Sequence, residues 1–495
     1  MPTHSNTKKS IGVSFATQYV EMAIQFVGVL MLARILSPDD IGVFSVASFL
    51  MTLLHAFRDF GVVQYIIQER DLTREKIQAA MGVAIMLALA VALTLLACSS
   101  AVARFYGNPE IQKVLMVMAG SFAISPFGSL LIGIFRREFQ LKTIFYIKTS
   151  SAICHVTVAV TLAFNGFGAL SLAWANFAGI LSFGIAANLL RPAGVPWTPR
   201  FKHMGTILSF GGIASLGNAA NQAGTNIPDM VIGKVMNMAA VGYFSRAAGL
   251  VQLFTRLITG ALLPLVLPYF SEKQRQNADL ALPYLASVEL LTALAWPFFA
   301  ALALLASPMI RTLYGDQWNA SVPIVRLLCL AGAIASITLF AAQVMVASGR
   351  VRNSTYCNLI AQPFRVAAVV FGSTYGLMAI ALGLVASELV TLMVVSWFLH
   401  RTIAVGLLRQ LQVCVKSAGV TACAAIGPAL VLLYWPAVSA HPSLPLSVGI
   451  AGAAIGWLGS MQLFNHPLGT HIFASLAQLQ AGWSGLGNRA PKDLP

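Results

Sequence analysis

The residues best able to do chemistry are ionisable side chains that interrupt long apolar stretches. A charge at the centre of a bilayer costs about 2.5–3.5 kcal/mol on insertion scales, so such residues usually mark ion or substrate pathways. Asp229 follows Pro228, where a helix kinks and frees backbone groups, and is a candidate for ion or proton coupling. The full set is Glu21, Arg58, Asp59, Lys148, His155, Asp229, Arg246, Arg256, Glu289, Arg365 and Glu388.

Polar side chains also recur along single helix faces in four of the apolar segments. Residues three and four apart share a face, and lipid cannot satisfy their polar groups. The stripes therefore predict a water-filled cleft, with hydrogen bonding between helices as the alternative reading. They are Ser14, Gln18, Glu21 and Gln25; Ser45, Ser48, Thr52, His55 and Asp59; Ser215, Asn218, Gln222, Thr225 and Asp229; and Ser245, Gln252, Arg256 and Thr259.

The segments that carry these residues are long and apolar enough to cross a membrane. Of 495 residues, 58% are hydrophobic and 9% are charged, whereas soluble domains average about 25% charged residues. One span needs about 20 mostly apolar residues, and this predicts an all-α polytopic membrane protein with about fourteen spans. They run 11–36, 42–67, 77–103, 111–135, 143–164, 168–190, 205–235, 239–268, 282–306, 321–347, 355–374, 377–400, 414–435 and 446–464.

The basic residues indicate an orientation. If the N-terminus is cytoplasmic and the spans alternate, twenty of the 31 Lys and Arg residues lie in inside segments, seven in outside segments and four within spans. This bias follows the positive-inside rule and favours an even span count with both termini in the cytoplasm. The same rule explains the net charge of +15 without a nucleic-acid partner. The six cysteines lack metal-ligand spacing, so no metal is expected. No cofactor is predicted for the chain.

An internal repeat organises the first twelve spans. Ile41-Gly-Val-Phe-Ser45 is similar to Val241-Gly-Tyr-Phe-Ser245, and Tyr106-Gly107 is similar to Tyr314-Gly315. Two matching six-helix bundles around a central cleft, related by an axis along the membrane normal, are therefore predicted. The regions are a cytoplasmic N-terminus (1–10), an N-lobe (11–190), a cytoplasmic loop (191–204), a C-lobe (205–400), two added spans with their preceding loop (401–464) and a cytoplasmic tail (465–495).

Three segments carry a family resemblance. They are Ala33-Arg-Ile-Leu-Ser-Pro-Asp-Asp-Ile-Gly-Val-Phe-Ser45, Arg104-Phe-Tyr-Gly107 and Gly242-Tyr-Phe-Ser-Arg246. In order and spacing they resemble the polysaccharide-transport branch of the multidrug/oligosaccharidyl-lipid/polysaccharide (MOP) exporter superfamily. This branch comprises bacterial lipopolysaccharide and exopolysaccharide flippases.

The resemblance implies a substrate, a mechanism and a location. The substrate would be an undecaprenyl-pyrophosphate-linked oligosaccharide, moved between leaflets of the bacterial inner membrane by alternating access of two lobes. Such transport is often coupled to H⁺ or Na⁺. Membrane lipids and the polysaccharide polymerase or export machinery are the implied partners.

Combined with the charge pattern, the resemblance assigns roles to residues. Arginine donates forked hydrogen bonds to phosphate oxygens, so Arg58, Arg256 and Arg365 are the predicted headgroup ligands, with Lys148 and Arg246 as secondary candidates. Related lipid II flippases place arginines in the first, second and eighth spans, whereas the polar stripe of the first span here carries Gln18, Glu21 and Gln25 instead. The predicted coupling acids and polar cleft residues are Glu21, Asp59, Asp229, Glu289, Glu388, Gln18, Gln25, Asn218 and Gln222.

Two other functions compete with this one. A membrane glycosyltransferase could use Asp39-Asp40 as an acidic pair, but the repeat partner is Ala239-Ala240, and a helix cap explains the acids better. Moreover, the chain has no sizeable extramembrane region to bind an acceptor. A multidrug or cation antiporter of the same superfamily would share the fold, and the arginines within spans disfavour a cationic substrate.

Overall fold

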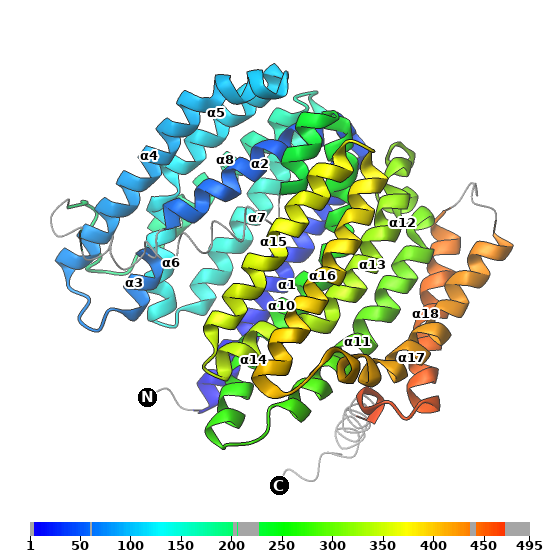
Figure 1. Cartoon of the computed structure of the whole chain (residues 1–495). Coiled ribbons are helices and arrows are strands. Elements are labelled where there is room, and N and C mark those ends of the chain that lie inside the picture. Colours follow the sequence, from blue (N-terminus) through cyan, green and yellow to red (C-terminus); the bar gives the residue numbers. More distant parts are fainter. Residues whose placement is uncertain (1–3, 60–61, 201–204, 206–226, 436–441, 471–495) are drawn as a thin grey trace, which may run out of the picture. The chain divides into compact units, whose positions relative to one another are not determined.

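The structure is a computed structural model that describes residues 4–59, 62–200, 205, 227–435 and 442–470. In that part of the chain every regular element is a helix, which confirms the all-α fold class (Figure 1). The first half contains α1 (His4–Ile35), α2 (Pro38–Asp59), α3 (Val62–Gln68), α4 (Arg74–Tyr106), α5 (Pro109–Ile124), α6 (Pro126–Arg137), α7 (Leu141–Phe164) and α8 (Ala169–Leu189). The second half contains α10 (Met238–Arg275), α11 (Ala281–Leu304), α12 (Ala306–Leu313), η1 (Asp316–Ser321), α13 (Val322–Thr338), α14 (Ala341–Ala347), α15 (Val351–Ser373), α16 (Leu377–Ile403), α17 (Leu407–Tyr434) and α18 (Ser443–Leu463).

The described residues contain nine continuous candidate spans, and two bent helix pairs raise the number to eleven. One of these pairs is α5 and α6, which are bent by 45° where Pro126 begins α6. The count of fourteen is therefore not confirmed. The three remaining predicted spans are 42–67, 205–235 and 355–374. The first includes residues 60–61, which lie outside the described residues, as does most of the second. The third coincides with α15, whose polar side chains lower its hydropathy.

The helices form two compact units. Unit 1 comprises residues 1–246, 313–320 and 369–380, and unit 2 comprises residues 247–312, 321–368 and 381–495. Short segments from the second half of the chain thus complete a unit that is built mainly from the first half. The lobes predicted at 11–190 and 205–400 remain a prediction based on the repeat.

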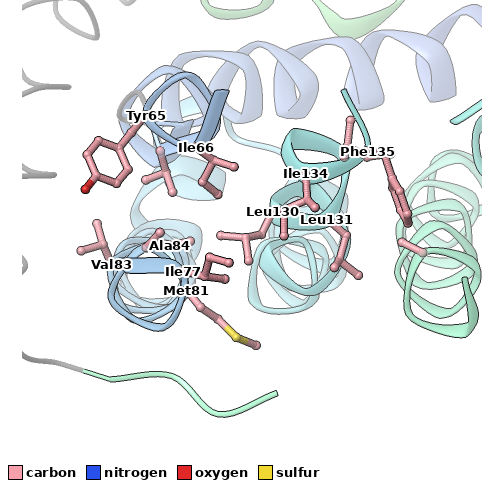
Figure 2. Packing of buried hydrophobic residues seen from close by; sticks show 14 of the residues in the cluster. Tyr65, Ile66, Ile77, Met81, Val83, Ala84, Leu130, Leu131, Ile134 and Phe135 are labelled. Carbon is pink, nitrogen blue, oxygen red and sulfur yellow. The ribbon is translucent and has the colours of Figure 1, made fainter. Parts of the chain in front are cut away.

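Unit 1 has a core where α3, α4 and α6 meet (Figure 2). Ile66, Leu131 and Phe135 are fully buried there. Beside this core, the Arg137 guanidinium donates to the carbonyl oxygens of Ile66 at 2.8 Å and Arg70 at 3.1 Å, and also to that of Glu69. Because these carbonyls lie at and beyond the end of α3, they have no helical donor. Arg137 therefore fixes the end of α3 to the end of α6.

Unit 2 includes the two added helices α17 and α18, which pack against each other (Figure 1). They meet at glycines. A Cβ added at Gly427 would lie 2.6 Å from the Gly452 Cα, and one added at Gly456 would lie 2.5 Å from the Cys423 carbonyl oxygen. Small residues allow helix backbones to approach closely in a membrane, where burial of apolar surface provides little driving force between helices. This contact therefore needs glycine at these positions.

Candidate functional site

In unit 1, one ion pair joins two membrane helices. The Lys148 ammonium on α7 lies 2.9 Å from the Glu21 carboxylate on α1, and the two side chains are 32% and 28% exposed. The residues are 127 positions apart in sequence, so only the packing of α1 against α7 brings them together. The Glu21 carboxylate neutralises the single positive charge of the Lys148 ammonium. Of the two predicted neighbours on α1, Gln18 is half-buried and Gln25 is exposed.

In unit 2, a second ion pair joins α15 and α16. The Arg365 Nη1 lies 3.1 Å from the Glu388 Oε1, and the side chains are 28% and 15% exposed. A guanidinium has five N–H donors, and the Arg365 Nε is shielded from solvent with no hydrogen-bond partner among the described residues. A buried donor without a partner costs about 1–3 kcal/mol, so this group favours an added acceptor. Arg365 therefore holds Glu388 while one of its donors is unused in the part of the chain that the structure describes.

Arg256 is the most open of the predicted cations whose side chains the structure describes. It lies on α10, its side chain is exposed, and its Nη2 donates to Gln252 Oε1 at 3.2 Å one turn away. Within the part of the chain that the structure describes, no carboxylate pairs with it. A guanidinium held by one neutral amide keeps its full charge and most of its donors, and it can form a forked contact with a phosphate.

Arg246 lies in a different environment, in unit 1. Its guanidinium carbon is 5.8 Å from the centre of the Tyr314 ring and 5.6 Å from that of the Trp318 ring, within cation–π range. Its Nε is shielded from solvent and has no hydrogen-bond partner in the described part of the chain. Arg246 thus differs in environment from Arg256. Arg256 lies two to three turns further along α10 and belongs to unit 2.

Two predicted acids have no Lys or Arg partner among the described residues. Asp229 is half-buried next to the buried Pro228, and none of the described cationic groups forms an ion pair with it. The Glu289 Oε1 on α11 lies 4.0 Å from the His466 Nε2, and the Glu289 backbone carbonyl accepts from Ser417 Oγ at 3.2 Å. Both acids can take up a proton or a small cation, whereas Glu21 and Glu388 already have basic partners.

His466 belongs to this polar network but was not among the predicted site residues. It follows α18, is fully buried, and lies 3.4 Å from Ser417 Oγ. Its Nδ1 accepts from the Leu468 N–H at 3.2 Å, which places the proton of the neutral ring on Nε2, facing Glu289. Burial lowers the pKa of the imidazole and the charge of Lys416 adds to this effect, while Glu289 opposes both. A lone histidine just beyond the last predicted span was the available signal in the sequence.

Four predicted residues have side chains that the structure does not describe. The side chains of Arg58 and Asp59, at the end of α2, are not among the described ones, and neither are Asn218 and Gln222. The structure therefore gives no position for one of the three predicted principal headgroup ligands. The convergence of Arg58, Arg256 and Arg365 on a single chamber remains a prediction.

The acidic pair Asp39-Asp40 has structural partners. Asp40 Oδ2 accepts from the backbone N–H of Ser37 at 3.1 Å, while Ser37 Oγ accepts from the Asp40 N–H at 3.1 Å, a capping box that begins α2. The other oxygen, Oδ1, accepts from the Ala169 N–H at 3.1 Å, at the beginning of α8. In the second repeat, Asn237 Oδ1 caps by accepting from the Ala240 N–H at 2.8 Å. The predicted helix cap is confirmed.

A family model described as polysaccharide biosynthesis protein matches residues 31–323. This chain belongs to that family. The lipopolysaccharide biosynthesis protein WzxC of Escherichia coli is 20% identical over 356 residues, which cover 71% of each chain. The succinoglycan biosynthesis transport protein ExoT of Rhizobium meliloti is 24% identical over 336 residues, which cover 66% of each chain. The family resemblance seen in the sequence is confirmed.

Solved structures agree on the fold of this polysaccharide biosynthesis protein. It is similar to the lipid II flippase MurJ in an inward closed conformation, with a TM-score of 0.73 at 13% identity, covering 92% of this chain and 98% of the other. It is also similar to an inward-facing MATE multidrug-resistance transporter of the MOP superfamily, with a TM-score of 0.65 at 15% identity, covering 80% and 98%. The fold is thus that of a membrane transporter of the MOP type, and the fold alone does not separate flippases from drug antiporters.

Proposed function

We propose that this protein is a flippase that moves undecaprenyl-pyrophosphate-linked oligosaccharide across the bacterial inner membrane by alternating access. Membership in the polysaccharide biosynthesis family supports the role. Neither a polar sugar nor an anionic pyrophosphate crosses hydrocarbon unaided, so the headgroup needs a polar, cationic route. The undecaprenyl tail can stay in lipid throughout.

The observation that carries the proposal is the state of the arginines within the predicted spans. Arg256 has no carboxylate partner among the described residues, and Arg365 keeps a shielded, unused Nε donor beside its pair with Glu388. In a low-dielectric setting such groups attract an anion strongly, and the planar guanidinium matches the oxygen geometry of phosphate. Arg256 and Arg365 are therefore the leading pyrophosphate ligands in this proposal.

The acids are assigned to coupling. Because Glu21 and Glu388 are held by Lys148 and Arg365, Asp229 and Glu289 are the better candidates to take up H⁺ or Na⁺. Coupling by one of them would link ion uptake to a change of lobe arrangement. Both termini are assigned to the cytoplasm from the distribution of basic residues, and the polymerase or export machinery is assigned as the recipient of the product.

The test replaces Arg256 in a strain that depends on this protein for a surface polysaccharide. We expect Arg256→Ala to reduce polymer export by about tenfold or more, the loss expected for a charge-assisted contact. Lipid-linked repeat units should accumulate on the cytoplasmic side while the protein still reaches the membrane. Gln252→Ala, which removes the neutral neighbour of Arg256, is the matched control and should retain most export. Normal export by Arg256→Ala would remove this residue from the mechanism.

Contacts of the acidic side chains weigh against the two rival functions. An antiporter of cationic drugs needs open carboxylates, and of the four predicted acids that the structure describes Glu21 and Glu388 are already paired with basic groups, which leaves only Asp229 and Glu289. A glycosyltransferase using Asp39-Asp40 would need both carboxylates to be free. However, Asp40 accepts hydrogen bonds from backbone N–H groups at the beginnings of α2 and α8. Sugar transfer by the purified protein, or drug sensitivity of a deletion strain, would favour the corresponding rival.

A further inference from the structure

Within unit 1, the two copies of the repeated motif contact each other through small residues. Ser45 Oγ donates to Ser245 Oγ at 3.0 Å, and these residues hold the same place in the two repeats. A Cβ added at Gly42 would lie 1.7 Å from the Met238 carbonyl oxygen, and one added at Gly242 would lie 2.0 Å from the Pro38 carbonyl oxygen. The contact is thus reciprocal, and each backbone needs a glycine opposite it. This is the geometry expected of two segments related by a two-fold axis.

A second set of contacts at the same end of the helices has donors from the second repeat only. Gln317 Nε2 in η1 donates to the carbonyl oxygens of Ala33 at 2.6 Å and Leu36 at 3.3 Å. Trp318 Nε1 also donates to the Ala33 carbonyl, at 2.7 Å, and Trp318 is fully buried. The carbonyls in the last turn of a helix have no helical donor, so η1 supplies the missing donors to the end of α1. The offset of 208 that aligns Tyr106 with Tyr314 places Pro109 and Glu110 opposite Gln317 and Trp318, so the first repeat has no equivalent pair.

Further bonds between the halves of the chain surround this point. Tyr106 Oη donates to the Met230 carbonyl oxygen at 3.4 Å. The Lys234 ammonium donates to the Phe105 carbonyl and lies 4.3 Å from the centre of that residue's ring. The turns involved, around residues 36–42, 104–108, 235–239 and 313–320, are all predicted from the charge distribution to face outward. The end of unit 1 predicted to face outward is therefore closed by contacts between sequence halves.

We propose that Gln317 and Trp318 form a latch on the last turn of α1 that holds this end closed and must release before substrate leaves. The inference rests on the proposed function, because release matters only if transport alternates between two faces. The donors of the latch lie in a short segment between α12 and α13, so they can detach from α1 without unfolding a long helix. The Ser45–Ser245 contact lies nearby and reports whether the end is closed.

The test uses that contact as a reporter. Ser45→Cys and Ser245→Cys are introduced into a chain whose six native cysteines have been replaced, and disulfide formation is followed in membranes under mild oxidation. We expect rapid crosslinking in the otherwise unchanged chain. Gln317→Ala and Trp318→Phe should each slow crosslinking by roughly 5–30-fold, because losing one or two net hydrogen bonds shifts an equilibrium by about that factor. Gln317 is exposed, so Gln317→Ala tests the latch without disturbing a core.

Trp457→Phe is the matched control. Its Nε1 donates to the Ala293 carbonyl at 2.8 Å within unit 2, so it removes the same kind of bond elsewhere and should leave crosslinking unchanged. Equal crosslinking in the Gln317→Ala, Trp318→Phe and control chains would overturn the latch. Export is then measured with the cysteine pair oxidised and again after reduction. Slower crosslinking in the latch variants together with undiminished export by the oxidised pair would leave the contact a structural one and overturn the claim that it must release before substrate leaves.

Discussion

The two ion pairs inside the helices differ in what they leave available. Lys148 and Glu21 in unit 1 form a one-to-one contact at 2.9 Å, whereas Arg365 and Glu388 in unit 2 meet at 3.1 Å with the Arg365 Nε still unused. Both cations lie on the fifth predicted span of their repeat, yet Lys148 pairs with the first span and Arg365 with the sixth. An ammonium neutralised by a carboxylate mainly fastens two helices together, while a guanidinium with spare donors can also bind a ligand. We therefore propose a structural role for the first pair and a binding role for the second.

Replacing both residues of each ion pair should give the largest difference in export between the two pairs. Arg365→Gln with Glu388→Gln should reduce export by about tenfold or more, because the anion ligand is lost. Glu21→Gln with Lys148→Gln should retain most export, because two amides can still hydrogen-bond between α1 and α7. Polymer export per molecule of membrane-inserted protein is the measurement. The reverse order of the two double variants would exchange the roles assigned here.

Exchanging the two cations should give a smaller effect of the same kind. Arg365→Lys keeps the charge facing Glu388 but removes Nε and the planar fork, so export should fall several-fold. Lys148→Arg adds donors to a pair that does not need them, and export should remain near the normal level. Comparable losses in both variants would indicate that only the charge matters at these positions.

Removing one partner should reveal the structural cost of each pair. Glu388→Ala leaves Arg365 without its carboxylate, and Glu21→Ala does the same to Lys148. Each change should lower the free energy of unfolding by about 2 kcal/mol, less than for a fully buried pair because both pairs are partly exposed. The thermal midpoints of the purified variants are compared with those of the double variants, which should lie closer to the unaltered protein. Equal midpoints for single and double variants would show that neither pair constrains the helices.

The smallest effect is expected at the contact between His466 and Glu289. Unlike the two ion pairs, this contact contains a histidine. Burial lowers the pKa of His466, so its contribution to stability is complete above the ordinary histidine pKa of about 6.5 and is lost as the pH falls below it. Protonation at Nδ1 would also remove the acceptor for the Leu468 N–H. The thermal midpoint should therefore drop by about 2–4 °C more between pH 7 and pH 5.5 in the unaltered chain than in His466→Gln. Parallel pH profiles would show that His466 does not titrate in this range.

Much of the fold follows from local pattern. Long apolar segments predicted a helical membrane protein, and the resemblance of three segments to the polysaccharide-transport branch predicted a fold of the MOP type; the family match and the solved structures agree with both. The cap formed by Ser37 and Asp40 was also readable, because a capping box depends on residues three apart. Local information was enough for these features since a single helix or turn determines them.

The partners of the buried charges could not be predicted from the sequence. Glu21 and Lys148 were both recognised as candidates, but their pairing across 127 residues depends on how α1 packs against α7. Arg246 was assigned to the headgroup, yet it faces Tyr314 and Trp318 because η1 folds back toward α10. His466 was missed because its burial comes from the turn after α18. In each case tertiary packing decides which polar groups meet.

The most direct test is the binding of undecaprenyl pyrophosphate to the purified protein in lipid nanodiscs, measured for the unaltered chain and the two double variants. Affinity should fall about tenfold or more in Arg365→Gln with Glu388→Gln and change little in Glu21→Gln with Lys148→Gln. Undecaprenol, which has the tail but no phosphate, should bind all three chains equally weakly. Equal affinity of all three chains for the pyrophosphate would contradict the claim that Arg365 binds the anionic headgroup.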